Sequence, residues 1–283
     1  MESNPTDLSA LVISDKEFKM ISELVLDKVG IHLADNKRTL LVGRFRKYLL
    51  ENKLTFTEFH QKILADKTGN MQNDLTNMIT TNHTFFNREA THFAFFLKTV
   101  LPEIDLDMKQ NKKSDIRIWC AASSTGEEAI MIKLKMMEHF GVRYNSLNAG
   151  MLATDISTKV LNQARSGIYL QDNFKDLDPK IIDKHFKKVS PEKYKVNDNI
   201  IADIHYTIFN LVTGHYNFKQ KFQVIFCRNV MIYFDSPTKE KVINSLYNVL
   251  EPGGYLFIGH AESLSRIKHS YLDIQPAVYR KPQ

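Results

Sequence analysis

The chain has 283 residues, 43% of them hydrophobic, and a formal net charge of +6 from 38 basic and 32 acidic side chains. This balance is typical of a globular protein with one or two domains, and the basic excess is too mild to indicate a nucleic-acid-binding domain. Cys120 and Cys227 are the only cysteines, so a disulfide framework and a cysteine-based zinc site are excluded. Residues 1–17 lack the pattern of a secretory signal, and no apolar run approaches the roughly 20 residues of a membrane helix. We therefore expect a cytoplasmic protein.

The first part of the chain, up to about residue 95, has helical periodicity. Residues 15–33 and 36–53 repeat apolar side chains at helix spacing, and Gly30 is expected to end the first of these helices. In residues 55–66 a threonine precedes Phe59 and Ile63, which lie four positions apart. The pattern predicts an N-terminal helical domain over residues 1–95.

One stretch of this helical region is strongly basic. It places five cations within eleven residues and contains no acidic residue. Such a cluster is either a solvated helix face or a surface that meets an acidic partner, and the sequence leaves both interpretations open. The candidate partner-binding residues are Lys37, Arg38, Arg44, Arg46 and Lys47.

The second part of the chain, residues 96–283, begins with a polar stretch at 100–115 that we interpret as a connection. Strand-like and helix-like segments then alternate, and the strands are apolar almost throughout. This alternation indicates a parallel sheet covered by helices on both faces. The expected strands begin at residues 116, 148, 222 and 253, and the expected helices begin at 126, 158 and 238.

Residues 171–209 interrupt the alternation. Segments 186–198 and 200–210 carry Val, Ile, Tyr and Thr with polar residues between them, as short antiparallel strands do. An insertion of about 40 residues is long for an unstructured loop. We expect a small antiparallel β-subdomain inserted in the α/β domain.

A small-residue loop, "CAASSTGEEA" at 120–129, connects an expected strand to an expected helix. Neither the dinucleotide fingerprint nor the phosphate loop is present, and Glu127 and Glu128 would repel a pyrophosphate. A ligand without phosphates and with some positive charge fits better, and S-adenosylmethionine is such a ligand. The following strand ends at Asp155, which could accept from ribose hydroxyls or cap the helix that begins near Thr158.

The segment "TTNHTFFNRE" at 80–89 gathers amide, hydroxyl and arginine side chains beside two phenylalanines. Together with later segments it resembles the chemotaxis-receptor methyltransferases of the CheR type. The similar segments follow one another in the family's order, and "ADNKR" at 34–38 extends the likeness into the helical region. They are "IWCAASSTGEE", "ATDIS" with "VLNQARSGIY", "FNL", "VIFCRNVMIYFD" and "EPGGYLFIGHAESL".

The resemblance implies a Rossmann-like S-adenosylmethionine methyltransferase sheet, an N-terminal all-helical domain and an inserted antiparallel β-subdomain. It also implies that segment 80–89 forms part of the cofactor pocket, with Arg88 and Tyr233 as catalytic residues and Tyr233 near the transferred methyl group. His83, His92 and His260 show no metal-ligand spacing, so no metal is expected. The implied cofactor-binding residues are Asn82, Thr84, Arg88, Glu128, Asp155, Asn210, Leu211, Arg228 and Asn229.

Three positions depart from the family pattern. Asn87 stands where an aromatic residue is expected before Arg88, and Ala129 and Ile130 stand where Pro-Tyr is common. Segment 187–196, "KKVSPEKYKV", is short and lacks the glycine-rich insertion of members that grip a tethering peptide at a receptor's C-terminus. We therefore do not expect peptide tethering.

The implied activity is S-adenosylmethionine-dependent O-methylation of glutamate side chains, with S-adenosylhomocysteine as product. The implied partner is the cytoplasmic helical region of methyl-accepting chemoreceptors, and we expect a monomer without nucleic-acid binding or membrane insertion. A catalytically silent S-adenosylmethionine-binding signalling module is the alternative. A nucleic-acid methyltransferase would carry an "NPPY"-like motif, but the corresponding strand continues as "CRNVMIYF".

Overall fold

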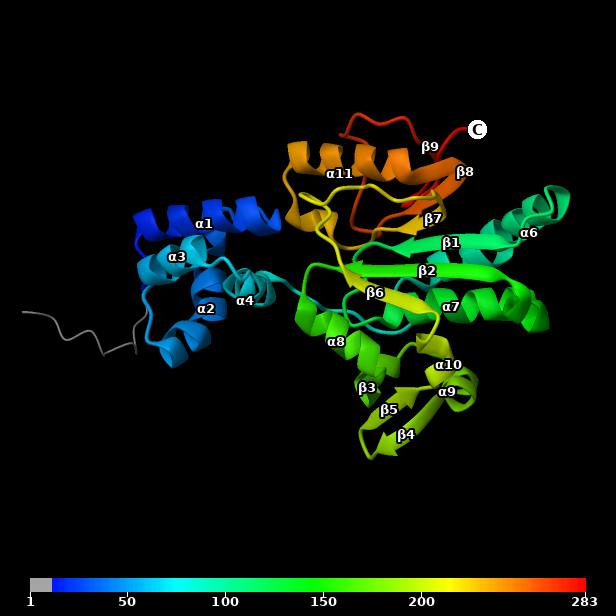
Figure 1. The fold of residues 1–283 in the computed structure, drawn as a ribbon, viewed down its shortest axis with the longest axis horizontal. Coiled ribbons are helices and arrows are strands. Elements are labelled where there is room, and N and C mark those ends of the chain that lie inside the picture. Colours follow the sequence, from blue (N-terminus) through cyan, green and yellow to red (C-terminus); the bar gives the residue numbers. More distant parts are fainter. Residues whose placement is uncertain (1–11) are drawn as a thin grey trace, which may run out of the picture. The chain divides into compact units, whose positions relative to one another are not determined.

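The structure, a computed structural model, describes residues 12–283 (Figure 1). Its contacts divide the chain into two compact units. The smaller contains the residues up to Thr81 together with Tyr233–Asp235, and the larger contains Asn82–Ile232 and Ser236–Gln283. Residues 82–95, which the sequence pattern grouped with the helical domain, therefore make most of their contacts in the larger unit.

The smaller unit is helical, as the periodicity predicts. Ser14 and Glu17 form a capping box at the start of the first helix, and Gly30 ends it in the left-handed conformation. The core includes Phe45, whose ring meets Phe59 edge to face at 5.4 Å between centroids. The elements are α1 (Asp15–Val29), the 3-10 turn Asp35–Lys37, α2 (Arg38–Asn52), α3 (Phe56–Ala65) and α4 (Asn70–Ile79).

The larger unit is built on a seven-stranded sheet of order β6-β2-β1-β7-β8-β10-β9 (Figure 1). The first five strands in this order pair in parallel, and β10 pairs antiparallel with both β8 and β9. This confirms the predicted Rossmann-like class. The strands are β1 (Asp115–Cys120), β2 (Asn148–Asp155), β6 (Ile204–Ile208), β7 (Phe222–Phe226), β8 (Leu250–Phe257), β9 (Leu272–Gln275) and β10 (Val278–Arg280).

The helices of this unit connect and cover the strands. α7 (Glu127–Phe140) follows β1, α8 (Thr158–Ser166) follows β2, and α11 (Ser236–Val249) leads from β7 to β8. The chain enters the unit through α5 (Ala90–Phe95) and the π-helical turn Phe96–Val100. Further helical segments are the 3-10 turns Gly141–Ser146 and Gln171–Phe174, with α9 (Pro179–His185) and α10 (Asp198–Ile201). The 3-10 turn Met231–Tyr233 ends on a residue that is grouped with the smaller unit.

The stretch 100–115 is not a connection, which corrects the interpretation from sequence. It contains α6 (Leu101–Gln110), which buries Leu101, Ile104 and Met108. These residues are three and four positions apart, so one helical face is apolar although charged residues stand between them.

The inserted β-subdomain is confirmed as a three-stranded antiparallel sheet of order β3-β5-β4. Its strands are β3 (Ile168–Leu170), β4 (Phe186–Ser190) and β5 (Lys193–Val196). Residues 204–208, which we grouped with it, instead form β6 and pair in parallel with β2. Alternating burial is common to half-buried strands of both kinds, so the period alone did not show which sheet this strand joins.

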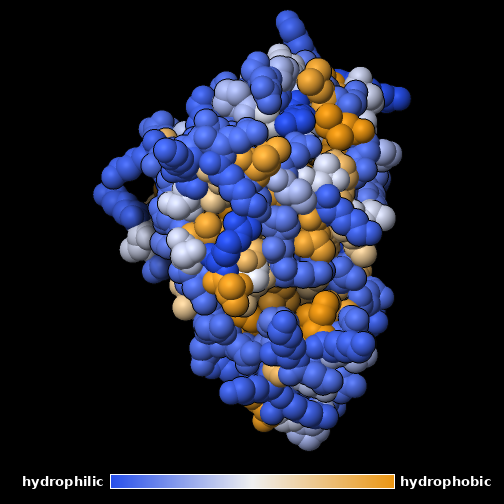
Figure 2. All heavy atoms as spheres, turned by 90° about the vertical axis from the view of Figure 1, so that its right-hand side faces the viewer, coloured by the Kyte–Doolittle hydropathy of each residue, from blue (hydrophilic) through white to orange (hydrophobic). Residues whose placement is uncertain are grey.

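The face in Figure 2 is mainly hydrophilic, and its apolar residues form separate patches. Within residues 12–283, no helix is both long enough and apolar enough to cross a membrane.

Candidate functional site

The loop between β1 and α7 is tied to the carboxyl ends of two neighbouring strands. The Ala121 N–H donates to the Phe226 carbonyl at 2.7 Å, and the Ser123 N–H donates to the Thr154 carbonyl at 2.8 Å. The loop ends at Gly126, where φ is 95° and a Cβ would lie 2.9 Å from the Cβ of Ala164. Only glycine fits this position without strain, so the local sequence fixes the entry into α7.

Asp155 lies at the carboxyl end of β2 and connects this loop to the next helix. Its Oδ2 accepts from the Ser124 N–H at 2.9 Å, and its Oδ1 accepts from the Ser157 N–H at 3.0 Å. Burial raises the pKa of Asp155, and the backbone N–H groups act in the opposite direction. The helix-cap alternative is wrong, because Ser157 is the N-cap of α8 and accepts from the Val160 N–H.

Phe86 anchors the segment that precedes α5. Its side chain is fully buried and lies 4.9 Å from Tyr169, 4.8 Å from Phe174 and 5.1 Å from Phe186 between ring centroids. The Phe86 N–H donates to the Asn173 carbonyl at 3.0 Å. This packing explains the aromatic bulk in an otherwise polar stretch.

The backbone on both sides of Arg88 is left-handed. Asn87 has φ 62° and Glu89 has φ 57°. Asparagine tolerates this conformation better than an aromatic residue does, and Asn87 Nδ2 also donates to the Asp176 carbonyl at 3.0 Å. The departure at Asn87 thus has a local structural reason. The half-buried Arg88 donates from Nη1 to the His83 carbonyl at 2.8 Å.

Arg228, just beyond β7, joins three parts of the larger unit. Its side chain is only 1% exposed. One terminal nitrogen, Nη1, donates to Glu128, and the other, Nη2, donates to Glu89 Oε2 at 2.9 Å and to the Arg88 carbonyl at 2.7 Å. Burial alone would raise the pKa of Glu89, but the Arg228 charge and hydrogen bonds from Asn229, Arg228 and His260 lower it to about 2. Glu89 is therefore ionised throughout the neutral range.

A second carboxylate, that of the half-buried Glu262, shapes the turn after Arg228. It accepts the backbone N–H groups of Asn229 at 2.9 Å, Met231 at 2.7 Å and Gly259 at 2.6 Å. Glu89 and Glu262 were both missed from sequence, although both stand inside the motifs quoted above. The available signal was an acidic residue within each of these segments.

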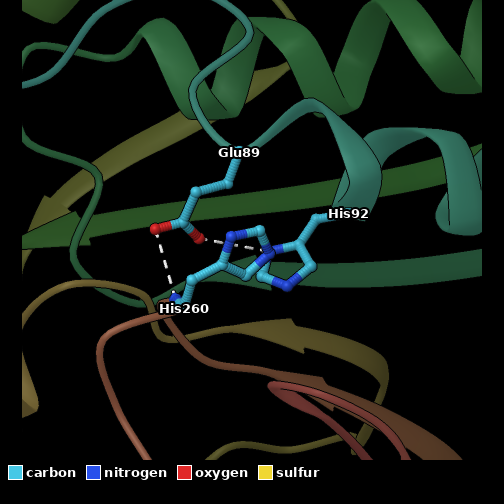
Figure 3. Close-up of side chains that lie close together, drawn as sticks. All are labelled: Glu89, His92 and His260. Carbon is cyan, nitrogen blue, oxygen red and sulfur yellow. Dashed lines mark hydrogen bonds and ion pairs between the residues drawn. The ribbon is translucent and has the colours of Figure 1, made fainter.

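One group of side chains within residues 12–283 has metal-ligand chemistry, namely Glu89, His92 and His260 (Figure 3). Their ligand atoms lie within 4.8 Å of one another, although no spacing in the sequence links them. Burial, then the charges of Arg228 and His260, lower the pKa of His92 to about 3, so the imidazole is neutral. However, a metal ion here would lie beside the Arg228 guanidinium, and Glu89 already accepts from Arg228, Asn229 and the His260 N–H. The nearby guanidinium charge and the occupied Glu89 carboxylate therefore disfavour a metal cation at this position.

The other predicted site residues lie in different parts of the structure. Asn82 joins the β1–α7 loop, since its carbonyl accepts from Ser124 Oγ at 3.2 Å. Leu211 is buried and Thr84 is half-buried. Tyr233 is grouped by its contacts with the smaller unit, where its carbonyl accepts from the His32 N–H at 3.1 Å. Its placement near a transferred methyl group therefore stays a prediction. Asn210 Oδ1 accepts from the Val212 N–H at 2.8 Å.

The members of the basic cluster at 37–47, which begins in the 3-10 turn Asp35–Lys37 and continues along α2, differ in exposure and in contacts. Arg44 donates to the Ile79 carbonyl and to Thr81 Oγ1, and burial lowers its pKa. Arg38 pairs with Asp15 at 2.9 Å and also lies over the Phe18 ring. These two arginines hold the helical unit together. The solvent-exposed members are Lys37, Arg46 and Lys47.

Family models match both units. The "CheR methyltransferase, SAM binding domain" matches residues 82–279, and the "CheR methyltransferase, all-alpha domain" matches residues 16–80. The chain is 35% identical to a chemotaxis protein methyltransferase of Borreliella burgdorferi, covering 95% of each chain. It is 32% identical to one of Escherichia coli, covering 92% of this chain and 89% of that one.

The matches cover almost the whole of the described chain and leave no large region unexplained. The larger unit is an S-adenosylmethionine-binding methyltransferase domain, so the cofactor expected from sequence is confirmed. The chain belongs to the CheR methyltransferase family.

Proposed function

We propose that this protein is a protein-glutamate O-methyltransferase that forms methyl esters on glutamates in the cytoplasmic helical region of chemoreceptors. The observation that carries the proposal is the match over both units to CheR methyltransferases. Relatives that span nearly the same length are named chemotaxis protein methyltransferases, which supports a sensory-adaptation role.

The site chemistry agrees with a carboxylate acceptor. A glutamate side chain with a pKa of about 4.3 is already ionised at neutral pH, so the enzyme needs no general base. Cys120 and Cys227 are fully buried, and burial raises the pKa of both thiols, which makes them unsuitable as nucleophiles. The residues have to orient the two reactants and exclude water, an effect worth up to roughly 7–11 kcal/mol in favourable cases.

The donor and acceptor groups fit S-adenosylmethionine, which when bound supplies a methyl group on a sulfonium cation. Asp155 offers carboxylate oxygens at the carboxyl end of β2, where ribose hydroxyls are commonly held. The Arg228 guanidinium is occupied by Glu89, Glu128 and the Arg88 carbonyl, so we assign it the shaping of the pocket. The remaining proposed cofactor contacts are Asn82, Thr84, Arg88, Glu128, Asn210, Leu211 and Asn229, and Tyr233 is the proposed aromatic residue near the methyl group.

The proposed receptor-binding surface is the exposed part of the basic cluster at 37–47, namely Lys37, Arg46 and Lys47. A receptor helix with several methylatable glutamates is acidic, and complementary charge mainly accelerates encounter. Arg38 and Arg44 are omitted from this surface because both are less exposed than the other three cations.

The proposal is tested by incubating the protein with methyl-tritiated S-adenosylmethionine and chemoreceptor cytoplasmic fragments. We expect label on the receptor that base treatment releases as volatile methanol, the signature of a methyl ester. The matched control is the same fragment with its methylatable glutamates changed to alanine, which should remain unlabelled. Label that resists base would indicate another acceptor, and binding of cofactor without any transfer would indicate the silent signalling module.

A further inference from the structure

The backbone around Arg88 is held in a conformation that its own sequence does not favour. Asn87 and Glu89 both have positive φ, and left-handed backbone at a residue other than glycine persists only where the surroundings enforce it. For Asn87 the surroundings are the hydrogen bond to Asp176 and the buried ring of the preceding Phe86. For Glu89 the enforcement comes from its side chain.

The Glu89 carboxylate is bound on both of its oxygens. Oε2 accepts from Arg228 Nη2 at 2.9 Å, and Oε1 accepts from Asn229 Nδ2 at 3.1 Å and from the His260 N–H at 3.2 Å. These donors follow β7 and β8, two adjacent strands of the main sheet. Glu89 therefore fastens the start of α5 to the carboxyl edge of that sheet, as the direction of its side chain in Figure 3 shows.

Arg228 couples this attachment directly to Arg88. The same Nη2 that donates to Glu89 also donates to the Arg88 carbonyl at 2.7 Å. The guanidinium thus holds the carbonyl of one residue and the carboxylate of the next, which fixes the peptide plane between them. The direction in which the Arg88 side chain leaves the backbone depends on that plane.

We propose that Glu89 is a positioning residue for Arg88: its carboxylate, bound by Arg228, Asn229 and His260, locks the left-handed turn that aims the Arg88 guanidinium at the reacting groups. The inference rests on the proposed function for Arg88's part in the reaction. The lock itself consists only of contacts within the larger unit.

Glu89→Gln is the informative variant because it keeps the shape of the side chain and removes its charge. Both carboxylate oxygens of Glu89 accept from donors, so the NH₂ group of the glutamine would face a donor in either orientation of the amide. At least one of the three hydrogen bonds is therefore lost. Glu103→Gln is the matched control, since Glu103 also pairs with an arginine, Arg280, at 3.0 Å in the same unit. Glu89→Asp keeps the charge but shortens the reach, and should give an intermediate effect.

We expect Glu89→Gln to lower kcat for receptor methylation at least about tenfold, with a smaller change in the Kd of S-adenosylhomocysteine measured by calorimetry. Arg88→Lys and the double variant complete a double-mutant cycle. If Glu89 acts through Arg88, the double variant loses no more activity than the more impaired single variant. Losses that multiply, or a Glu89→Gln enzyme within twofold of wild type, would overturn the proposal.

Hydrogen exchange separates the lock from the proposed reaction. In Glu89→Gln the amides of residues 86–93 should exchange at least about tenfold faster than in wild type, whereas in Glu103→Gln they should not. This measurement needs no substrate, so it still decides whether Glu89 locks the turn if the wild-type protein methylates no receptor. Unchanged protection of residues 86–93 in Glu89→Gln would refute the lock even if the enzyme is active.

Discussion

The two units use arginine side chains in different ways, and the contrast separates surface charge from buried chemistry. In the basic cluster at 37–47 the cations are close in sequence, and the exposed Lys37 and Lys47 accompany an Arg44 that donates to neutral oxygens. In the larger unit Arg228 is buried between two carboxylates that are 139 and 100 residues away along the chain. A local cluster of charge shows up in the sequence, whereas a buried ion network has to be assembled by the fold.

The largest effect should come from removing the buried guanidinium. Arg228→Met leaves the carboxylates of Glu89 and Glu128 buried without their counter-ion, and breaking such a pair typically costs about 3–5 kcal/mol. We expect the free energy of unfolding in urea at pH 7 to fall by that amount. Arg44→Met removes hydrogen bonds to neutral groups and should cost about 1 kcal/mol. Equal decreases in the free energy of unfolding of the two variants would show that Arg228 contributes no more to stability than Arg44 does.

Acid should weaken the same network. The folded-state pKa of Glu89 is about 2 against a usual 4.5, so its stabilisation is present above about pH 5 and is lost as the pH falls toward 2. At 1.36 kcal/mol per unit the contribution is at most about 3 kcal/mol. We expect the difference in unfolding free energy between wild type and Glu89→Gln to narrow from pH 7 to pH 3. A difference that stays constant over this range would mean that Glu89 titrates normally.

Asp155 tests the carboxyl edge of the sheet. If Asp155 accepts from the ribose hydroxyls as proposed, Asp155→Ala leaves them without an acceptor, which typically costs about 1–3 kcal/mol of binding free energy. The expected result is a Kd for S-adenosylhomocysteine raised at least fivefold in calorimetry. Ser157→Ala is the control, because it removes the α8 cap and costs about 1 kcal/mol of stability while leaving the carboxylate in place. Unchanged affinity in a folded Asp155→Ala protein would restrict Asp155 to holding the loop.

Arg88 tests whether the segment before α5 takes part in the reaction. Arg88→Lys keeps the positive charge and loses the planar fork, and we expect a methylation rate at least about tenfold lower, or 1.4 kcal/mol of barrier. If Arg88 orients the incoming glutamate, the affinity for cofactor should change less than the rate. If it binds the carboxylate of the cofactor, both should change by the same factor. A fully active variant would remove Arg88 from the mechanism.

Most of the fold could be predicted because its signals are local. Apolar strands alternate with amphipathic helices, and Gly30 ends α1 as expected. The errors occurred where composition or period is ambiguous. In α6 the charged residues obscure the apolar face in the sequence. In β6 polar and apolar residues alternate, and this pattern does not show whether the strand joins the small sheet or the main one, where it pairs with β2.

The candidate site residues could be proposed from the sequence only where they stand in recognisable motifs. Asp155 and the segment around Arg88 stand out by type and position, and the resemblance supplied the rest. Glu89 and Glu262 were missed because their function depends on what they contact. Their partners follow β7 and β8, and only the parallel pairing of those strands brings them to one edge. The proximity of His92 and His260 could not be predicted from their spacing in the sequence for the same reason.

The smallest effect should come from substituting the exposed cations of the basic cluster at 37–47. The double variant Lys37→Glu, Lys47→Glu should raise the apparent KM for the receptor fragment severalfold at low salt, because long-range attraction to an acidic helix mainly raises the association rate. The effect should fade at 0.15 M salt, where charges are screened beyond about 8 Å. Stability should change by less than about 0.5 kcal/mol, as for other surface positions, and the affinity for S-adenosylhomocysteine should not change. Lys193→Glu on the exposed part of β5 controls for net charge. If that variant alters KM as much per charge as the α2 variant does, or if neither does, α2 is a solvated face and the receptor binds elsewhere.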